Sequence, residues 1–235
     1  MTVTSVPSNT SACARDASRP RLAEFRGVLI INADDWGGWK RGTDAALACH
    51  ERRRITSVSA MVFMEDSERA AVLAKAADID VGLHVNFTTT FSGGNCPARL
   101  AEAQDRIRRF LKRSKYALIV YNPFLRESFR YVYQAQAEEF IRLYGRPPSH
   151  VDGHQHMHLS SNMLLDGIIP RGQKVRRSFS FWPGEKGLIN LTYRRWVDRR
   201  ISRRYVLTDY FFSLSQCVRH KRFERVLELA KAARV

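Results

Sequence analysis

Short apolar runs alternate with longer amphipathic stretches along the first third of the chain. Runs rich in Val, Ile and Ala at residues 27–33, 57–63 and 80–86 predict strands, because each is short and ends in polar turn residues. Stretches with apolar residues at helical spacing follow at 43–53 and 66–77. This alternation predicts βαβ units, a largely parallel sheet and an α/β fold class.

The alternation becomes less regular in the middle of the chain. A Thr/Gly-rich loop at residues 88–94 precedes two long helical patterns, at 98–115 and 124–144. An insertion of this kind over strand ends is where substrate loops lie. The remaining expected elements are a strand opening at residues 149–153, a further segment at 162–169, and helices at 191–204 and 220–233.

The N-terminal 22 residues are rich in Ser, Thr, Pro and Ala, and they have no apolar segment of the secretory type. We expect residues 1–22 to be a disordered leader and residues 23–235 to form a single catalytic domain. The hydrophobic content of 44% excludes a wholly disordered protein, and no run of about 18 apolar residues predicts a membrane span. The four cysteines lie far apart, which favours reduced thiols and a cytoplasmic location.

Four of the seven histidines fall within residues 149–158, S-H-V-D-G-H-Q-H-M-H. An extended strand would place every second residue of this segment on one face, namely His150, Asp152, His154, His156 and His158. Crowded imidazoles and a carboxylate need a metal or other partners, so the cluster favours a metal or catalytic site. The alternative, which we favour for any single histidine, is a solvated loop.

Two more polar groups follow apolar strands. Asp34 and Asp35 end the first run, and the turn at Gly37 would let both carboxylates reach one site; an acidic helix cap is the alternative. His84 and Asn86 share one face of the third run, where a structural histidine is the alternative. Because parallel strands gather their carboxyl ends at one rim, we expect a divalent metal site with one carboxylate and two imidazoles, suited to hydrolysis.

At these places the chain resembles the YdjC-like carbohydrate deacetylases, the family of the chitooligosaccharide deacetylases. The motifs N-A-D-D-[FW]-G, G-[LM]-H-x-x-x-T and H-[ILV]-D-[SG]-H-x-H-x-H stand at residues 32–37, 82–88 and 150–158. The resemblance implies a deformed (βα) barrel of the polysaccharide-deacetylase type. It also implies that Asp35, His84 and His154 hold the metal and that Asp34 is the general base.

The implied activity is metal-dependent removal of the N-acetyl group from a carbohydrate containing N-acetylglucosamine. The ion is expected to be Zn or Mg, with Mn, Co or Ni as alternatives. The leaving amine needs a proton, and His156 or His158 is the candidate donor, with His156 placed first. The groups expected beside the metal or the substrate are Asp152, His158 and Asn86, and some of these would fix the tautomer of a ligand.

One departure from the family pattern concerns the C-terminus. Members usually continue into a further strand with a His-Pro-Gly-like motif, whereas this chain stops at Val235. Either the polypeptide is truncated or the sequence has diverged, and the barrel would then lack its last strand. An open edge of that kind favours a homodimer, and the missing histidine puts catalytic competence in question.

The charge balance suggests a competing interpretation. The chain has 39 Lys plus Arg against 23 Asp plus Glu, a net charge of +16, and residues 171–204 hold eleven of the cations against two acids. A helix within this segment is amphipathic and basic, so a nucleic-acid-binding or membrane-binding protein on a deacetylase frame is one alternative. We disfavour nucleic acid and retain peripheral association with an anionic membrane; a metal-dependent phosphoesterase is a third hypothesis.

Overall fold

The computed structural model describes residues 29–114, 116–182, 184–219 and 221–232. The chain divides into a larger unit, Ile30–Lys221, and a smaller unit made of its two ends, Met1–Leu29 and Arg222–Val235. In the smaller unit the structure describes one helix, α8 (Phe223–Ala232). The leader expected at residues 1–22 lies outside the described residues.

The larger unit is built on a parallel sheet. Its strands lie in the order β1 (Asn32–Trp36), β2 (Ser57–Ala60), β3 (Asp80–Val85) and β4 (Val151–Gly153). Two parallel bridges extend the sheet beyond β4, one joining Val151 to Val175 and the next joining Lys174 to Val206. The predicted α/β class with a parallel sheet is confirmed, and a strand order that follows the chain is typical of a (βα) barrel.

The first strand begins later than its apolar pattern predicts. Ile30 and Ile31 are 55% and 42% exposed, and the ladder with β2 starts only where Asn32 pairs with Ser57. The ladder then continues to Trp36, which is fully buried. The polar sequence N-A-D-D-W is therefore itself the strand, which places its two carboxylates at the carboxyl end of the sheet.

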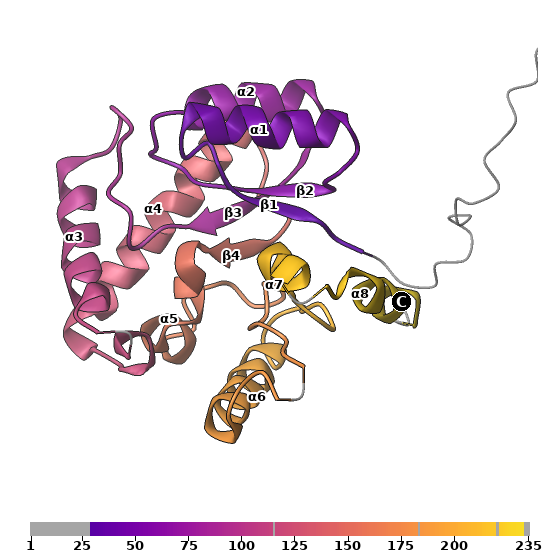
Figure 1. Ribbon diagram of the computed structural model, residues 1–235. Coiled ribbons are helices and arrows are strands. Elements are labelled where there is room, and N and C mark those ends of the chain that lie inside the picture. The colour runs from indigo at the N-terminus through magenta and orange to yellow at the C-terminus, as the bar shows by residue number, and fades with distance from the viewer. Residues whose placement is uncertain (1–28, 115, 183, 220, 233–235) are drawn as a thin grey trace, which may run out of the picture. The chain divides into compact units, whose positions relative to one another are not determined.

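Helices cover the strands of the larger unit. They are α1 (Lys40–Glu51), α2 (Ser67–Ala76), α3 (Ala98–Lys112), α4 (Arg126–Tyr144), α5 (Ser161–Leu165), α6 (Leu188–Ser202) and α7 (Leu214–Arg219), with short 3-10 turns η2 (Ala117–Ile119), η3 (Pro123–Leu125) and η4 (His154–Leu159). Helices α1 and α2 lie together on one side of the sheet, and α6 lies on the opposite side (Figure 1). The described helices include no segment long and apolar enough to cross a bilayer.

Helix α4 fixes the end of β3. Its apolar side buries Phe129 and Phe140 completely, and Gln136 between them is also fully buried. The Gln136 side chain accepts a hydrogen bond from the Asn86 backbone N–H at 2.7 Å and donates one to the Asn86 carbonyl at 3.1 Å. The backbone leaving β3 is thus held where it leads into the loop after His84.

Gly82 in β3 lies directly beneath the ring of His150. A Cβ atom at this position would overlap the imidazole, which Ser59 Oγ and Ser149 Oγ hold at 3.0 Å each. We expect Gly82→Ala to lower the free energy of unfolding by about 1–3 kcal/mol through overpacking. The measurement is chemical denaturation. Gly94→Ala is the control, since a Cβ there meets nothing within 4 Å, and equal effects of the two changes would contradict the expectation.

Candidate metal centre

Three strand ends bring the predicted ligands together. Asp35 comes from the end of β1, His84 from β3, and His154 follows directly after β4. The Asp35 Oδ1 atom lies 3.2 Å from His84 Nε2 and 2.8 Å from His154 Nδ1. One carboxylate oxygen and two imidazole nitrogens, 119 residues apart at the extremes, therefore converge on one point.

The backbone of Asp35 explains how two neighbouring aspartates face one site. Adjacent residues of a regular strand point to opposite faces, but Asp35 has a φ of +62° and the pairing of β1 with β2 shifts between Ala33 and Trp36. The turn expected at Gly37 thus begins inside the strand, at Asp35 itself. A left-handed non-glycine residue costs of the order of 1–3 kcal/mol, and such strain is typical of functional sites.

The nitrogen of each histidine that faces away from Asp35 also has a partner. His84 Nδ1 donates to Asp152 Oδ1 at 2.6 Å, and His154 Nε2 lies 3.1 Å from Thr89 Oγ1. Fixed partners of this kind set the tautomer and orientation of a metal-binding imidazole. Both rings therefore present their other nitrogen toward Asp35.

Arg176 is a member of the site that the sequence pattern does not single out. Its guanidinium donates to both Asp34 oxygens, at 2.7 and 2.6 Å, and also to Asp152 Oδ2. The Arg176 side chain is 9% exposed, Asp152 is fully buried and Asp34 is 42% exposed. Arg176 thus joins the carboxylate at the mouth of the site to the one at its base.

A second set of acidic and imidazole groups, Asp34, His84 and Asp152, is also close enough to bind a cation. Arg176 already forms ion pairs with both of its carboxylates. The set of Asp35, His84 and His154 is therefore the better metal site. Around it, three carboxylates against one guanidinium leave two negative charges if the imidazoles are neutral, which matches a divalent cation.

The charges around Asp35, His84 and His154 favour a positive charge at the point where these three side chains meet. Burial favours the neutral form of His84, but Asp152 and Asp35 outweigh it and raise the pKa of His84 to about 10. Burial also opposes the charge on Asp35, yet hydrogen bonds from His154 and His84 hold its pKa below the ordinary value. In the absence of a metal, a proton on His84 therefore supplies part of the missing positive charge.

The strand expected at residues 149–153 is present as β4, but the segment does not stay extended as far as His158. Strand β4 ends at Gly153, and η4 follows with Gln155 and His156 at φ values of +54° and +60°. The histidines consequently do not share one face. His150 lies over Gly82, and His154 reaches Asp35.

The two later histidines contact groups other than Asp35. The ring of His156 packs edge-on against Phe179 at 4.3 Å and near Phe211 at 5.7 Å. His158 is 1% exposed, and its Nε2 donates to the Arg176 carbonyl at 2.9 Å. Burial lowers the pKa of His156 to about 4 and that of His158 to about 3, so both rings are neutral at pH 7.

Asn86 acts on the loop after β3. Its Oδ1 accepts from the backbone N–H groups of Thr88 and Thr89, and its Nδ2 donates to the Thr89 carbonyl at 2.6 Å. Asn86 is fully buried. It therefore holds Thr89, the partner of His154, and does not itself face the mouth of the site.

The chain is similar to known proteins along most of its length. Residues 28–234 match the YdjC-like protein family. The carbohydrate deacetylase of Mus musculus is 29% identical over 230 residues, which cover 87% of this chain and 71% of the mouse protein. The chitooligosaccharide deacetylase of Proteus mirabilis is 31% identical over 133 residues, 56% of this chain and half of that protein.

A solved structure shares the fold. It is the crystal structure of a candidate cellobiose-phosphate cleavage protein from Enterococcus faecalis, with a TM-score of 0.56 and 17% identity. The match covers 86% of this chain and 74% of that chain. At this identity the likeness concerns the arrangement of strands and helices alone.

Proposed function

The chain belongs to the YdjC-like protein family, and from this premise we propose that it is a metal-dependent hydrolase that removes the N-acetyl group from an N-acetylated sugar. The observation that carries the proposal is the meeting of Asp35, His84 and His154, whose ligand atoms all lie within 4.8 Å of one another, beside a separate carboxylate, Asp34. The names of the mouse and Proteus relatives support a carbohydrate as the substrate. The site chemistry supports amide hydrolysis, which needs a metal position and a base side by side.

Asp35, His84 and His154 would hold the ion. When bound, a divalent cation would polarise the acetamido carbonyl and lower the pKa of a water molecule. The residues fit such an ion because both imidazoles have their outer nitrogens fixed, by Asp152 and Thr89. Zn, Mg, Mn, Co and Ni all accept this donor set.

Asp34 is the proposed general base. Arg176 and Asn32 donate to its oxygens, at 2.6–2.8 Å, so the carboxylate is fixed while 42% of the side chain faces solvent. It would take one proton from the attacking water. Since burial keeps His156 neutral at pH 7, the proton that reaches the leaving amine is the one that Asp34 took up, delivered directly or through His156.

The test is release of free amine from N-acetylchitooligosaccharides with and without a chelator. We expect chelation to abolish release and added divalent ions to restore it. His84→Ala and His154→Ala should lose both activity and roughly one bound ion per chain, because each removes a ligand of the same cation. His50→Ala on α1 is the matched control and should leave both unchanged. Hydrolysis of aryl phosphates without amine release would favour the phosphoesterase hypothesis instead.

A further inference from the structure

Helix α6 carries an exposed face that the proposed chemistry does not use. Val197 and Ile201 are 2% and 1% exposed, and they define the side of α6 that packs on the rest of the larger unit. The helical period places six residues on the opposite side, and we call them the α6 outer face. They are Leu188, Thr192, Arg195, Trp196, Arg199 and the C-cap residue Arg203, all of them exposed.

Large apolar side chains are unusually exposed at the start of this helix. Leu188 is 82% exposed, its neighbour Ile189 is 89% exposed, and Trp196 two turns later is 50% exposed. The helical pattern does not require an apolar side chain at any of these three positions, and a polar residue would fit each of them equally well. Aliphatic residues and a tryptophan exposed together on one helix are typical of a surface that enters a membrane interface.

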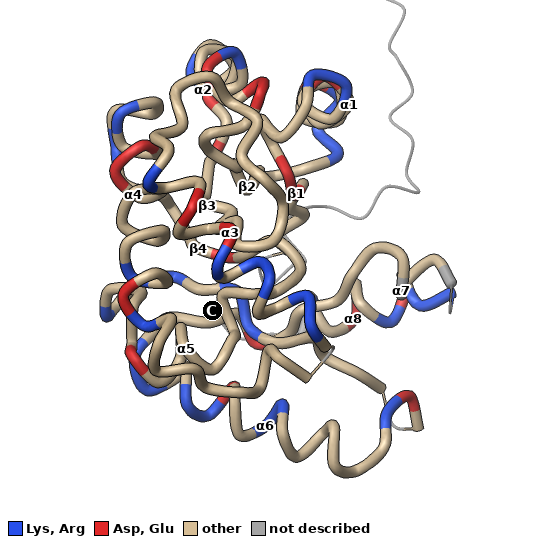
Figure 2. Tube along the Cα trace, turned by 90° about the vertical axis from the view of Figure 1, so that its left-hand side faces the viewer, with Lys and Arg blue, Asp and Glu red and all other residues tan. Residues whose placement is uncertain are grey.

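The same face is basic and carries no acid. Asp198 is the one acidic residue of α6, and it accepts from Arg177 Nη2 at 2.6 Å and from Ser178 Oγ at 2.8 Å. Among the described residues, no carboxylate lies within ion-pair distance of the Arg195 or Arg199 side chain, and Asp198 pairs with Arg177. Figure 2 shows Lys and Arg recurring along α6. An anionic surface is thus the complementary partner.

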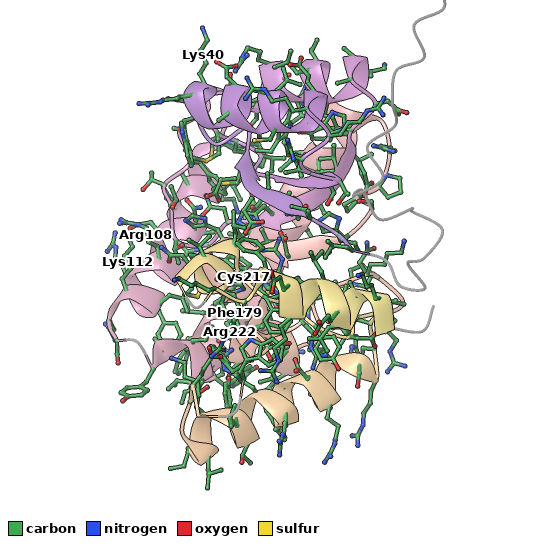
Figure 3. The ribbon with its side chains drawn as sticks, turned by 45° about the vertical axis from the view of Figure 1, so that its right-hand side comes forward. Lys40, Arg108, Lys112, Phe179, Cys217 and Arg222 are labelled. Carbon is green, nitrogen blue, oxygen red and sulfur yellow. The ribbon has the colours of Figure 1, made fainter. Side chains whose placement is uncertain are left out.

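The connectivity places one end of α6 beside the candidate site. Lys174 and Val206 lie on adjacent parallel sheet positions, and α6 belongs to the crossover between them. A crossover helix runs antiparallel to its strands, so its N-terminal end lies at the carboxyl ends of the strands. This connectivity directs the N-terminal end of α6, with Leu188 and Ile189, toward the rim where Asp34 and His84 lie. Phe179, which contacts His156, lies between the strands and α6 (Figure 3).

A lipid bilayer fits this face better than the other partners of a basic surface. A nucleic acid would use the arginines but would leave the Leu188 and Ile189 side chains in water. A second copy of the chain would bring two sets of unpaired arginines together. A bilayer with anionic headgroups satisfies the cations and buries the aliphatic side chains at the same time.

We propose that the α6 outer face, together with Ile189, docks the protein peripherally on an anionic lipid bilayer, with the rim of the candidate site turned toward the lipid. The docking is independent of catalysis, because the α6 outer face shares no residue with the proposed metal ligands or base. A result that rejects the docking therefore leaves the deacetylase proposal unaffected, and the reverse also holds.

The test is flotation of the full chain with vesicles of phosphatidylcholine containing phosphatidylglycerol, compared with phosphatidylcholine alone. We expect binding to the anionic vesicles only, weakened by salt. Replacing Arg195, Arg199 and Arg203 together by Gln should reduce the vesicle partition coefficient about a hundredfold. Leu188→Ser with Ile189→Ser should reduce it at least tenfold without changing the net charge.

A charge-matched control removes Arg41, Arg52 and Arg54, three exposed arginines of the α1 region, by the same change to Gln. We expect this variant to float as the unmodified protein does, and circular dichroism should show all variants folded. Absence of binding to anionic vesicles would overturn the proposal. Equal losses of vesicle binding in the α6 and α1 variants would also overturn it. So would binding to DNA or RNA that depends on the α6 arginines, if the protein does not bind vesicles.

Discussion

Asp34→Asn is expected to reduce amine release by about 10²–10⁴-fold while leaving metal binding unchanged. The amide keeps the size of the side chain and can still accept from Arg176, but it cannot take a proton from water at neutral pH. Initial rates on N-acetylchitooligosaccharides, measured beside metal content by elemental analysis, check both halves of the prediction.

Asp35→Asn is the matched control, since it makes the same chemical change one residue along the chain. We expect this variant to lose the ion as well as the activity, because Asp35 is the one carboxylate among the proposed ligands. If Asp34→Asn also released the ion, Asp34 would be a ligand and not the base. Undiminished turnover in Asp34→Asn would show that another group activates the water.

A general rule predicted from the sequence that carboxylates and imidazoles would meet at one rim, while the choice of Asp35, His84 and His154 among them came from the family resemblance. Each residue ends or follows an apolar run, and the carboxyl ends of parallel strands meet at one rim. The alternation of apolar runs and helical patterns was enough to predict that sheet. The strands bring Asp35 and His84 to the rim, and His154 follows directly after the end of β4.

The path of residues 150–158 could not be predicted in the same way. Histidine at every second position imitates a strand, but Gln155 and His156 take left-handed backbone angles that only the surrounding structure can impose. The close approach of His158 to Gly153, where a Cβ would come within 2.9 Å of the His158 backbone nitrogen, requires that turn. Local propensity contains no sign of it.

Arg176 escaped prediction for a different reason. It lies in a basic run whose cations look equivalent in the sequence, and its partner Asp34 is 142 residues away. Burial distinguishes it: Arg176 is 9% exposed at the site, whereas Arg199 and Arg203 are exposed on α6. Charge can be counted from a sequence, but which cation is buried depends on the fold.

Arg176→Met is expected to lower the free energy of unfolding by about 3–5 kcal/mol and to reduce amine release sharply. The change leaves Asp152 buried without one of its cations, and it frees the Asp34 carboxylate from its fixed orientation. Arg177→Met is the matched control, because the neighbouring arginine pairs with Asp198 away from the proposed ligands and base. It should cost less stability and leave the rate nearly unchanged.

The pH dependence of the stability lost in Arg176→Met gives a sharper test. Burial disfavours the charge on Asp152, but His84 and Arg176 outweigh it and hold its pKa below the ordinary value. A depressed carboxylate pKa stabilises the folded state above the unfolded pKa, near pH 4, and that stability disappears as the pH falls. The gap in unfolding free energy between the unmodified protein and Arg176→Met should therefore be widest near pH 7 and should narrow below about pH 4.

Combining Arg176→Met with Asp152→Asn separates the two effects of Arg176. The neutral amide removes the uncompensated charge, so we expect it to recover part of the lost stability. Activity should not recover, because Asp34 still lacks the guanidinium that orients it and His84 has lost its carboxylate partner. Denaturation curves and amine release on the same samples measure both. If the double variant is no more stable than Arg176→Met, then Arg176 does not stabilise the fold by compensating the buried charge of Asp152.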